Sequence, residues 1–171
     1  MPGCAARPWA FMLLFAACGH ASNTCPDPAP AAGAVPTAAS EAPPAGMLDV
    51  LFAGRRLTAA LPELEAKAQL GPGETFKIVE VGRDANSSHH IVSLSAAEPL
   101  HRHDLHDLLV FTLRGSGQML LGDAERPIAT PSIVYVPRGT VHSMRPAPGA
   151  PMVGYAVFVP PFDGKDRVPV P

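Results

Sequence analysis

The sequence has few charged and few aromatic residues, which are 16% and 6% of its 171 positions. The net charge is −2, and no cluster of lysine and arginine occurs. A nucleic-acid partner or an anionic membrane surface usually requires a basic patch, so neither is predicted as a direct partner. With so few aromatic residues, a folded core must be built mainly from valine, leucine, isoleucine and methionine.

Other absences narrow the chemistry. The three cysteines, Cys4, Cys18 and Cys25, all lie near the N-terminus, outside the region where we expect a fold. This argues against a thiolate metal ligand or a cysteine nucleophile, and it leaves no pair for a disulfide in that region. The sequence contains no nucleophile elbow, no phosphate-binding glycine-rich loop and no dinucleotide-binding fingerprint.

The N-terminus has the pattern of an export signal. Arg7 precedes an uncharged run from Trp9 to Cys18, which is about half the ~20 residues that a membrane-spanning helix needs. The run ends in Phe-Ala-Ala-Cys and resembles a bacterial lipobox, although phenylalanine replaces the usual leucine. We expect residues 1–17 to be a signal peptide and Cys18 to be lipidated, which makes this an exported, membrane-anchored lipoprotein on the periplasmic or cell-surface side. The alternative is an ordinary secretory signal with Cys18 incidental.

The next segments connect this signal to a fold. Residues 18–46 are rich in proline and alanine and have little apolar surface to bury, so they predict a disordered tether. Residues 47–73 form a lead-in with partial helical periodicity, which predicts a short helix at about 60–69. The alternative is a plain lead-in segment that packs outside the barrel.

From Thr75 onward the sequence predicts an all-β domain. Short β-branched or alternating runs are separated by turn signals, as expected for a sandwich or small barrel rather than for alternating strands and helices. The predicted strands are 76–81, 90–95, 108–113, 118–121, 133–136 and 152–159. His89 and His90 begin one of these strands and belong to no motif, so we expect them at the surface or at a pocket rim.

Three histidines carry the main chemical signal. His101 and His103 are two positions apart, so on a strand both side chains project from the same face and can reach one ion. Further along, the turn Pro137-Arg138-Gly139 leads to His142 as another strand begins.

These motifs closely resemble those of the cupin superfamily. The first cupin motif, a His-x-His pair with a later glycine, maps onto His101, His103 and Gly115. The second motif maps onto Pro131, the turn 137–139 and His142. The resemblance implies a single cupin β-barrel, or jelly roll, over residues 74–160, followed by a C-terminal tail at 161–171. It also implies that the three histidines converge on a divalent transition metal, namely Fe, Mn, Zn, Ni or Cu.

The sequence departs from the cupin pattern in two places. Pro131 replaces a glycine, and the acidic ligand of the first motif is out of frame, because that motif's spacing to Gly115 selects Leu108. Asp107 is the nearest carboxylate, and strand alternation places it on the side of His101 and His103 unless a bulge intervenes. We therefore expect a three-histidine site with Asp107 as a fourth ligand or just outside the ligands. His106 is a candidate only if the strand bulges.

Two functions remain open from the sequence. The first is an extracytoplasmic metal-dependent enzyme, of dioxygenase, isomerase or lyase type, that acts on a small polar molecule. The second is a non-catalytic module that binds a small ligand or metal while tethered to the membrane. A homodimer is a further partner that the resemblance allows, and the membrane contact would be the N-terminal lipid anchor alone.

Overall fold

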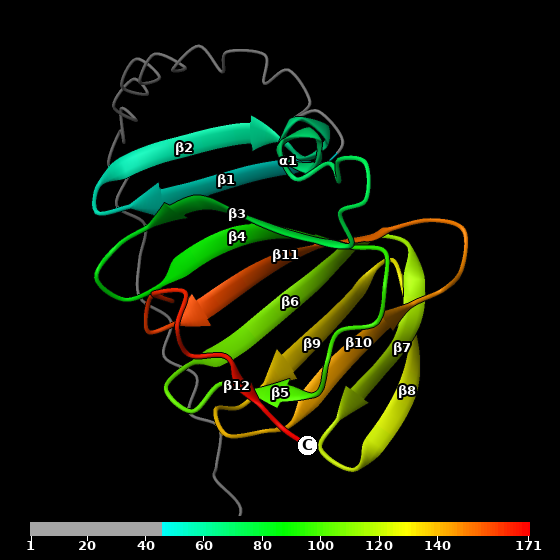
Figure 1. Ribbon diagram of the computed structural model, residues 1–171. Helices are drawn as coiled ribbons and strands as arrows, with labels where there is room; N and C mark the ends of the chain where they lie inside the picture. The colour runs from blue at the N-terminus through cyan, green and yellow to red at the C-terminus, as the bar shows by residue number, and fades with distance from the viewer. Residues whose placement is uncertain (1–45) are drawn as a thin grey trace, which may run out of the picture. The chain divides into compact units, whose positions relative to one another are not determined.

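The structure is a computed structural model that describes residues 46–171, so the expected signal peptide, Cys18 and nearly all of the tether lie outside the described residues. Two five-stranded antiparallel sheets form the domain, in the orders β12-β5-β10-β7-β8 and β3-β4-β11-β6-β9 (Figure 1). The first sheet comprises β5 (His101–Arg102), β7 (Ser116–Leu121), β8 (Ala124–Ala129), β10 (His142–Pro146) and β12 (Val168–Pro169). The second comprises β3 (Phe76–Arg83), β4 (Ser88–Leu94), β6 (Asp107–Arg114), β9 (Ser132–Val136) and β11 (Met152–Val159).

Strand β6 of the second sheet has apolar side chains on both faces, because both faces of this strand are covered. In β6, Leu108 and Val110 face the interior between the sheets, whereas Phe111 and Leu113 pack in a separate outer cluster. This explains why the β6 sequence is an almost continuous apolar run rather than a strict alternation. The interior cluster also contains Met119, Met144 and Met152, in keeping with a core that is poor in aromatic residues.

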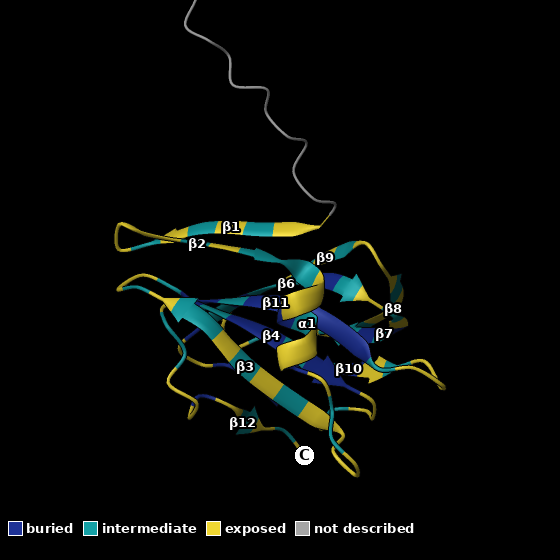
Figure 2. Ribbon diagram, turned by 90° about the horizontal axis from the view of Figure 1, so that it is seen from above, coloured by how far each residue is buried: buried dark blue, intermediate teal, exposed yellow. Residues whose placement is uncertain are grey.

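A hairpin and the helix cover the outer face of this sheet. The hairpin pairs β1 (Met47–Phe52) with β2 (Arg55–Ala60), and α1 (Leu61–Lys67) follows directly. Figure 2 shows α1 lying across β4 and β11, whose residues are largely buried. Leu64 and Ala68 are almost fully buried in the cluster beneath the helix. The predicted short helix is therefore confirmed, and it packs on the outer face of the sheet.

Two features of the strand pattern were not predicted from the sequence. The β1–β2 hairpin turns at Ala53 and Gly54, both with positive φ, and alanine rarely adopts that conformation. Strand β8 contains Pro127, which has no backbone N–H to donate. It can lie there because β8 is an edge strand, with no neighbouring strand on one side that would need this hydrogen bond.

The C-terminal residues belong to the barrel rather than extending beyond it as a tail. Strand β12 pairs with β5, and the Val170 N–H donates to the Leu100 carbonyl at 3.0 Å. The segment before β12 crosses the end of the barrel, where the Phe162 N–H donates to Ser88 Oγ at 2.8 Å. Within residues 46–171, no helix is long and apolar enough to cross a membrane.

Candidate metal centre

The barrel brings together the three histidines of the two sequence motifs. Strands β5 and β10 are neighbours, and their register places His142 directly opposite His101. His103 follows β5, and its carbonyl accepts the Gly139 N–H at 2.6 Å. This hydrogen bond joins the turn of the second motif directly to the first motif. Gly139 has φ of 76°, a conformation that favours glycine at this position of the turn.

The three imidazole rings form a compact group. The ring centroids of His101 and His142 are 4.3 Å apart, and His103 lies 5.3 Å from each of them. One ring nitrogen from each histidine lies within 4.8 Å of the others. Among residues 46–171, this is the one group of three or more histidine, cysteine or acidic side chains with ligand atoms so close together.

Backbone carbonyls fix the orientation of all three rings. His101 Nδ1 donates to the Pro99 carbonyl at 2.9 Å, His142 Nδ1 donates to the Thr140 carbonyl at 3.0 Å, and His103 Nδ1 donates to the Asp166 carbonyl. A carbonyl oxygen can only accept, so each Nδ1 carries the hydrogen and each neutral ring has a free Nε2 lone pair. This is the arrangement by which proteins commonly orient metal-binding histidines.

Burial keeps these imidazoles neutral. All three histidines are less than 5% exposed. Desolvation lowers the pKa of His101 to about 3 and that of His142 to about 4, and it also lowers the pKa of His103. The neutral imidazole is the form that binds a metal ion, so this site fits such an ion in donor type, tautomer and protonation state.

Asp107, which strand alternation placed beside His101 and His103, lies elsewhere. The strand is interrupted, since β5 ends at Arg102 and β6 begins at Asp107, so alternation does not carry across residues 103–106. The Asp107 carboxylate instead accepts the Arg138 backbone N–H at 2.9 Å and its guanidinium at 2.8 Å. These bonds to Arg138 lower the pKa of Asp107 to about 2.

His106 is also outside the cluster. It is buried, and its Nδ1 lies 2.5 Å from Asp166 Oδ2 while its Nε2 lies 3.2 Å from the Pro161 carbonyl. Both ring nitrogens therefore have protein partners. Asp166 in turn accepts the backbone N–H groups of Asp104 and Leu105 at 2.9 and 2.8 Å, so its carboxylate shapes the whole loop that follows His103.

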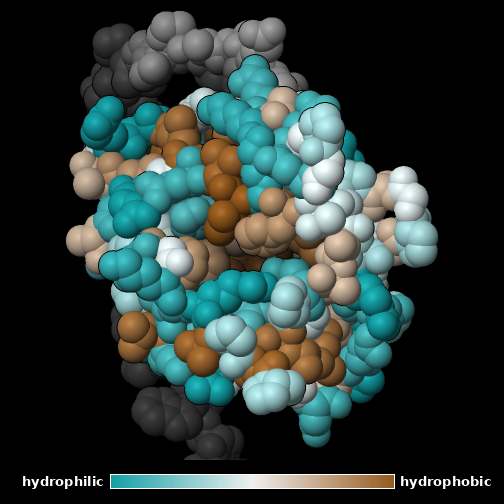
Figure 3. Space-filling model, in the orientation of Figure 1, coloured by the Kyte–Doolittle hydropathy of each residue, from teal (hydrophilic) through white to brown (hydrophobic). Residues whose placement is uncertain are grey.

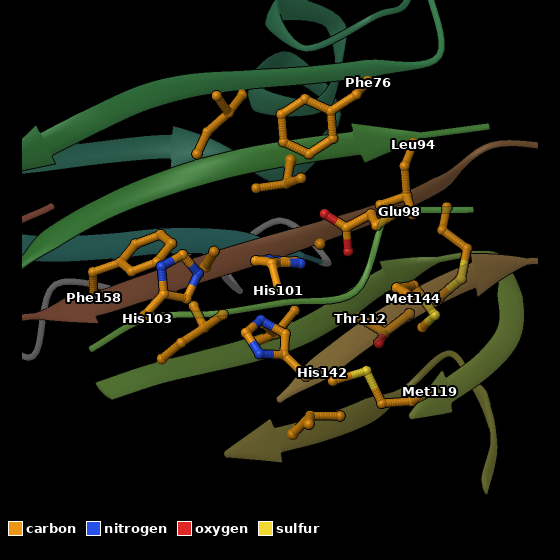
Figure 4. Close-up of a pocket in the computed structure, with 18 of the residues that line it drawn as sticks. Phe76, Leu94, Glu98, His101, His103, Thr112, Met119, His142, Met144 and Phe158 are labelled. Carbon is orange, nitrogen blue, oxygen red and sulfur yellow. The ribbon is translucent and has the colours of Figure 1, made fainter. Parts of the chain in front are cut away.

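A cavity of about 280 Å³ adjoins the three histidines. Figure 3 shows this face of the domain hollowed between the sheets, and Figure 4 shows the histidines at one side of the cavity. Most lining side chains are apolar, and the polar ones besides the histidines are Glu98, Thr112 and Arg167. The apolar lining residues include Phe76, Ile78, Val92, Leu94, Leu108, Val110, Met119, Val134, Met144, Met152, Phe158 and Phe162.

Sequence reasoning missed Glu98, Asp166 and Arg167. Glu98 precedes the His-x-His pair by three positions, and an acidic residue so close to the motif is a usable signal. Asp166 and Arg167 come from the expected tail and carry no such signal, because only the return of the chain to β5 brings them to the site. His90, expected at the surface or a pocket rim, is 5% exposed and hydrogen-bonded to Ser88 Oγ at 2.9 Å.

Comparison with known proteins agrees with this geometry. The family model of the AraC-like ligand binding domain matches residues 93–165, which include all three histidines. The search of curated proteins found no match. The two-sheet barrel and the solved structures that resemble it show that the chain has the cupin fold.

Three solved structures share the fold at low sequence identity. The protein TT1209 from Thermus thermophilus is 22% identical with a TM-score of 0.53, and the match covers 61% of this chain and 97% of that one. A variant of Streptomyces PAC13 with uridine is 15% identical with a TM-score of 0.52, covering 62% and 87%. The Schizosaccharomyces pombe Cnp3 cupin domain is 12% identical with a TM-score of 0.51, covering 67% and 87%.

Proposed function

We propose that this protein binds one divalent transition-metal ion through the Nε2 atoms of His101, His103 and His142. The observation that supports this most strongly is that three backbone carbonyls fix all three Nδ1 atoms, which leaves three unprotonated Nε2 atoms for one ligand. Imidazole suits Fe, Mn, Zn, Ni and Cu. Such an ion would supply Lewis-acid or redox chemistry at coordination positions that the three histidines leave open.

Thermal unfolding of the metal-free protein with a panel of divalent ions tests this proposal. An ion that binds only the folded state raises the melting temperature. At a free concentration one hundred times its Kd, it increases the free energy of unfolding by about 2.7 kcal/mol. His142→Ala should remove the shift, whereas His20→Ala, a matched change far from the motifs in sequence, should leave it unchanged. Equal shifts in wild type and His142→Ala would overturn the proposal.

We also infer that the cavity binds a small molecule beside the ion. The cavity is mainly apolar, so its ligand should carry more apolar surface than the small polar molecule that the motifs alone suggested. The PAC13 variant with uridine supports the idea that this fold can hold a small organic ligand.

Two functional classes follow from such a site: a metal-dependent enzyme, which we favour, and a non-catalytic binding module. One experiment separates them, in which metal-loaded protein is incubated with a mixture of small organic metabolites. Loss of one compound and appearance of a product supports the enzyme. Retention of a compound unchanged through gel filtration supports the binding module.

Location and assembly are separate proposals that rest on the sequence. The short apolar run ending at Cys18 and the tether at 18–46 support export and lipid anchoring of a domain that includes residues 74–160. Mass spectrometry of the mature protein should find Cys18 lipidated and N-terminal; an intact Met1 would contradict this. The homodimer that the family resemblance allows is tested by analytical ultracentrifugation.

A further inference from the structure

Besides the three histidines, the cavity contains one acidic side chain, Glu98. We propose that Glu98 is the ligand-recognition residue of this site, and that the ligand is a small, largely apolar molecule with a hydroxyl-type hydrogen-bond donor. This inference rests on the proposed function, because it places the ligand in the cavity next to the metal ion.

The backbone of Glu98 is held in place from both sides. Its N–H donates to the Met144 carbonyl at 2.9 Å, and its carbonyl accepts the Ser143 hydroxyl at 2.7 Å. Residue 98 is thereby fastened to β10, the strand that also carries His142. Figure 4 shows the carboxylate extending into the cavity toward His101. The backbone from which the carboxylate extends is therefore fixed, which lowers the ordering cost of binding.

The carboxylate has hydrogen-bonding capacity to spare. Its side chain is 16% exposed, and its charged partner is Arg167, with 3.5 Å between Oε1 and a guanidinium nitrogen. A carboxylate offers about four acceptor positions, and one long contact uses few of them. Burial raises the pKa of Glu98, and the Arg167 charge opposes that rise. A hydrogen-bond donor on the ligand would therefore give the buried carboxylate a second, shorter hydrogen bond.

The charge of Glu98 selects the group that lies beside it. The carboxylate repels an anionic group at this end of the cavity and attracts a hydrogen-bond donor. Phe76, Leu94 and Met144 lie around Glu98 and provide apolar contact (Figure 4). The volume of about 280 Å³ equals that of roughly nine water molecules at about 30 Å³ each, which suits a molecule the size of one substituted ring.

Two probes of matched shape test this inference: benzyl alcohol, which has a hydroxyl donor, and ethylbenzene, which has a methyl group in its place. Their binding to the zinc-loaded full-length protein is measured by nuclear magnetic resonance. Benzyl alcohol should bind about tenfold more tightly than ethylbenzene, because its hydroxyl can donate to the charged carboxylate and ethylbenzene has no donor. Glu98→Leu should abolish the difference, and Glu98→Gln, which keeps a neutral acceptor, should reduce it. Glu125→Gln, a change at an exposed carboxylate, should leave it intact.

The zinc content of each variant separates this inference from the proposed function. Glu98→Leu and Glu98→Gln should both keep the zinc content of the wild type; loss of zinc would make Glu98 a metal ligand and overturn the inference. An unchanged preference for benzyl alcohol in both variants, or equal binding of the two probes to the wild type, would also overturn it. If the wild type binds no zinc, the metal proposal fails, yet the same preference measured on the metal-free protein still tests Glu98. Should Glu98→Leu fail to fold, the reduced preference in Glu98→Gln decides the matter.

Discussion

At the scale of single residues, Asp107 shows how a motif position can take another role. Its carboxylate binds Arg138, in the turn that leads to His142, so it fastens the two histidine motifs without joining the metal cluster. The ion pair is open to solvent, and its contribution to stability is therefore small.

We predict that Asp107→Asn lowers the melting temperature slightly at neutral pH and leaves the metal content unchanged. The Arg138 bonds depress the pKa of Asp107 from 3.8 to about 2, so the native state binds this proton less tightly than the unfolded state. The stabilisation is complete above 3.8 and is lost as the pH falls toward about 2, where the variant and the wild type should melt alike. Asp104→Asn, at an exposed carboxylate bound to Arg102, is the matched control for metal content. Metal loss in Asp107→Asn as large as in His101→Ala would show that Asp107 is a ligand.

The histidines were predictable from the sequence, whereas their supporting groups were not. His-x-His on one strand face and a Pro/Gly turn before a third histidine are local patterns, and the register of β5 and β10 joins them. The predicted position of Asp107 assumed that strand alternation continues across residues 103–106, and the loop at these residues interrupts it. Asp166 lies more than sixty residues from His103, and no local pattern reports such a contact.

At the scale of secondary-structure elements, the C-terminal segment completes the site. The Asp166 carbonyl orients His103, and the Asp166 carboxylate holds His106 and two backbone amides of the loop after His103. The same segment supplies Phe162 and Arg167 to the cavity wall. It is therefore part of the functional unit, although the sequence alone placed the end of the barrel at residue 160.

We predict that Asp166→Ala weakens metal binding by up to about 10-fold, because it keeps the carbonyl that orients His103 but removes the carboxylate bonds that hold the loop after His103. The metal should still bind at saturating concentration, because the three histidines remain. Titration of metal-free protein with zinc measures this. Asp163→Ala, which removes a local bond to the Lys165 N–H, is the control and should leave the affinity unchanged. Equal zinc affinity in wild type and Asp166→Ala would mean that the Asp166 carboxylate does not support the site.

The helix and hairpin make a second testable element. Leu64 is 1% exposed beneath α1, whereas Leu51 in the hairpin is 64% exposed. We predict that Leu64→Ala destabilises the protein by about 2–5 kcal/mol through lost burial and a residual cavity. Leu51→Ala should change the stability by no more than about 0.5 kcal/mol. Urea unfolding measures both, and similar effects of the two changes would contradict the packing of α1 on the outer face.

At the scale of the whole molecule, the described region is a two-sheet barrel with one face of one sheet covered by residues 47–68. The six strand ranges predicted from the sequence all correspond to strands, because short apolar or alternating runs between turn signals are typical of strands. The hairpin β1–β2 and the edge strand β8 were not predicted. Alanine is unusual at the positive φ of Ala53 in the hairpin turn, and proline is unusual inside a strand, where Pro127 lies. Sequence patterns thus define the barrel's centre well and its edges poorly.

The most direct test of the central claim is elemental analysis of the protein purified without added metal, with a triple His101→Ala, His103→Ala, His142→Ala variant purified alongside. We predict one divalent transition-metal ion per chain in the wild type and none in the triple variant. Circular dichroism should show that the variant keeps its β-structure, so that loss of metal is not loss of fold. One metal ion per chain in the folded triple variant, or none in the wild type even after incubation with divalent ions, would contradict the account.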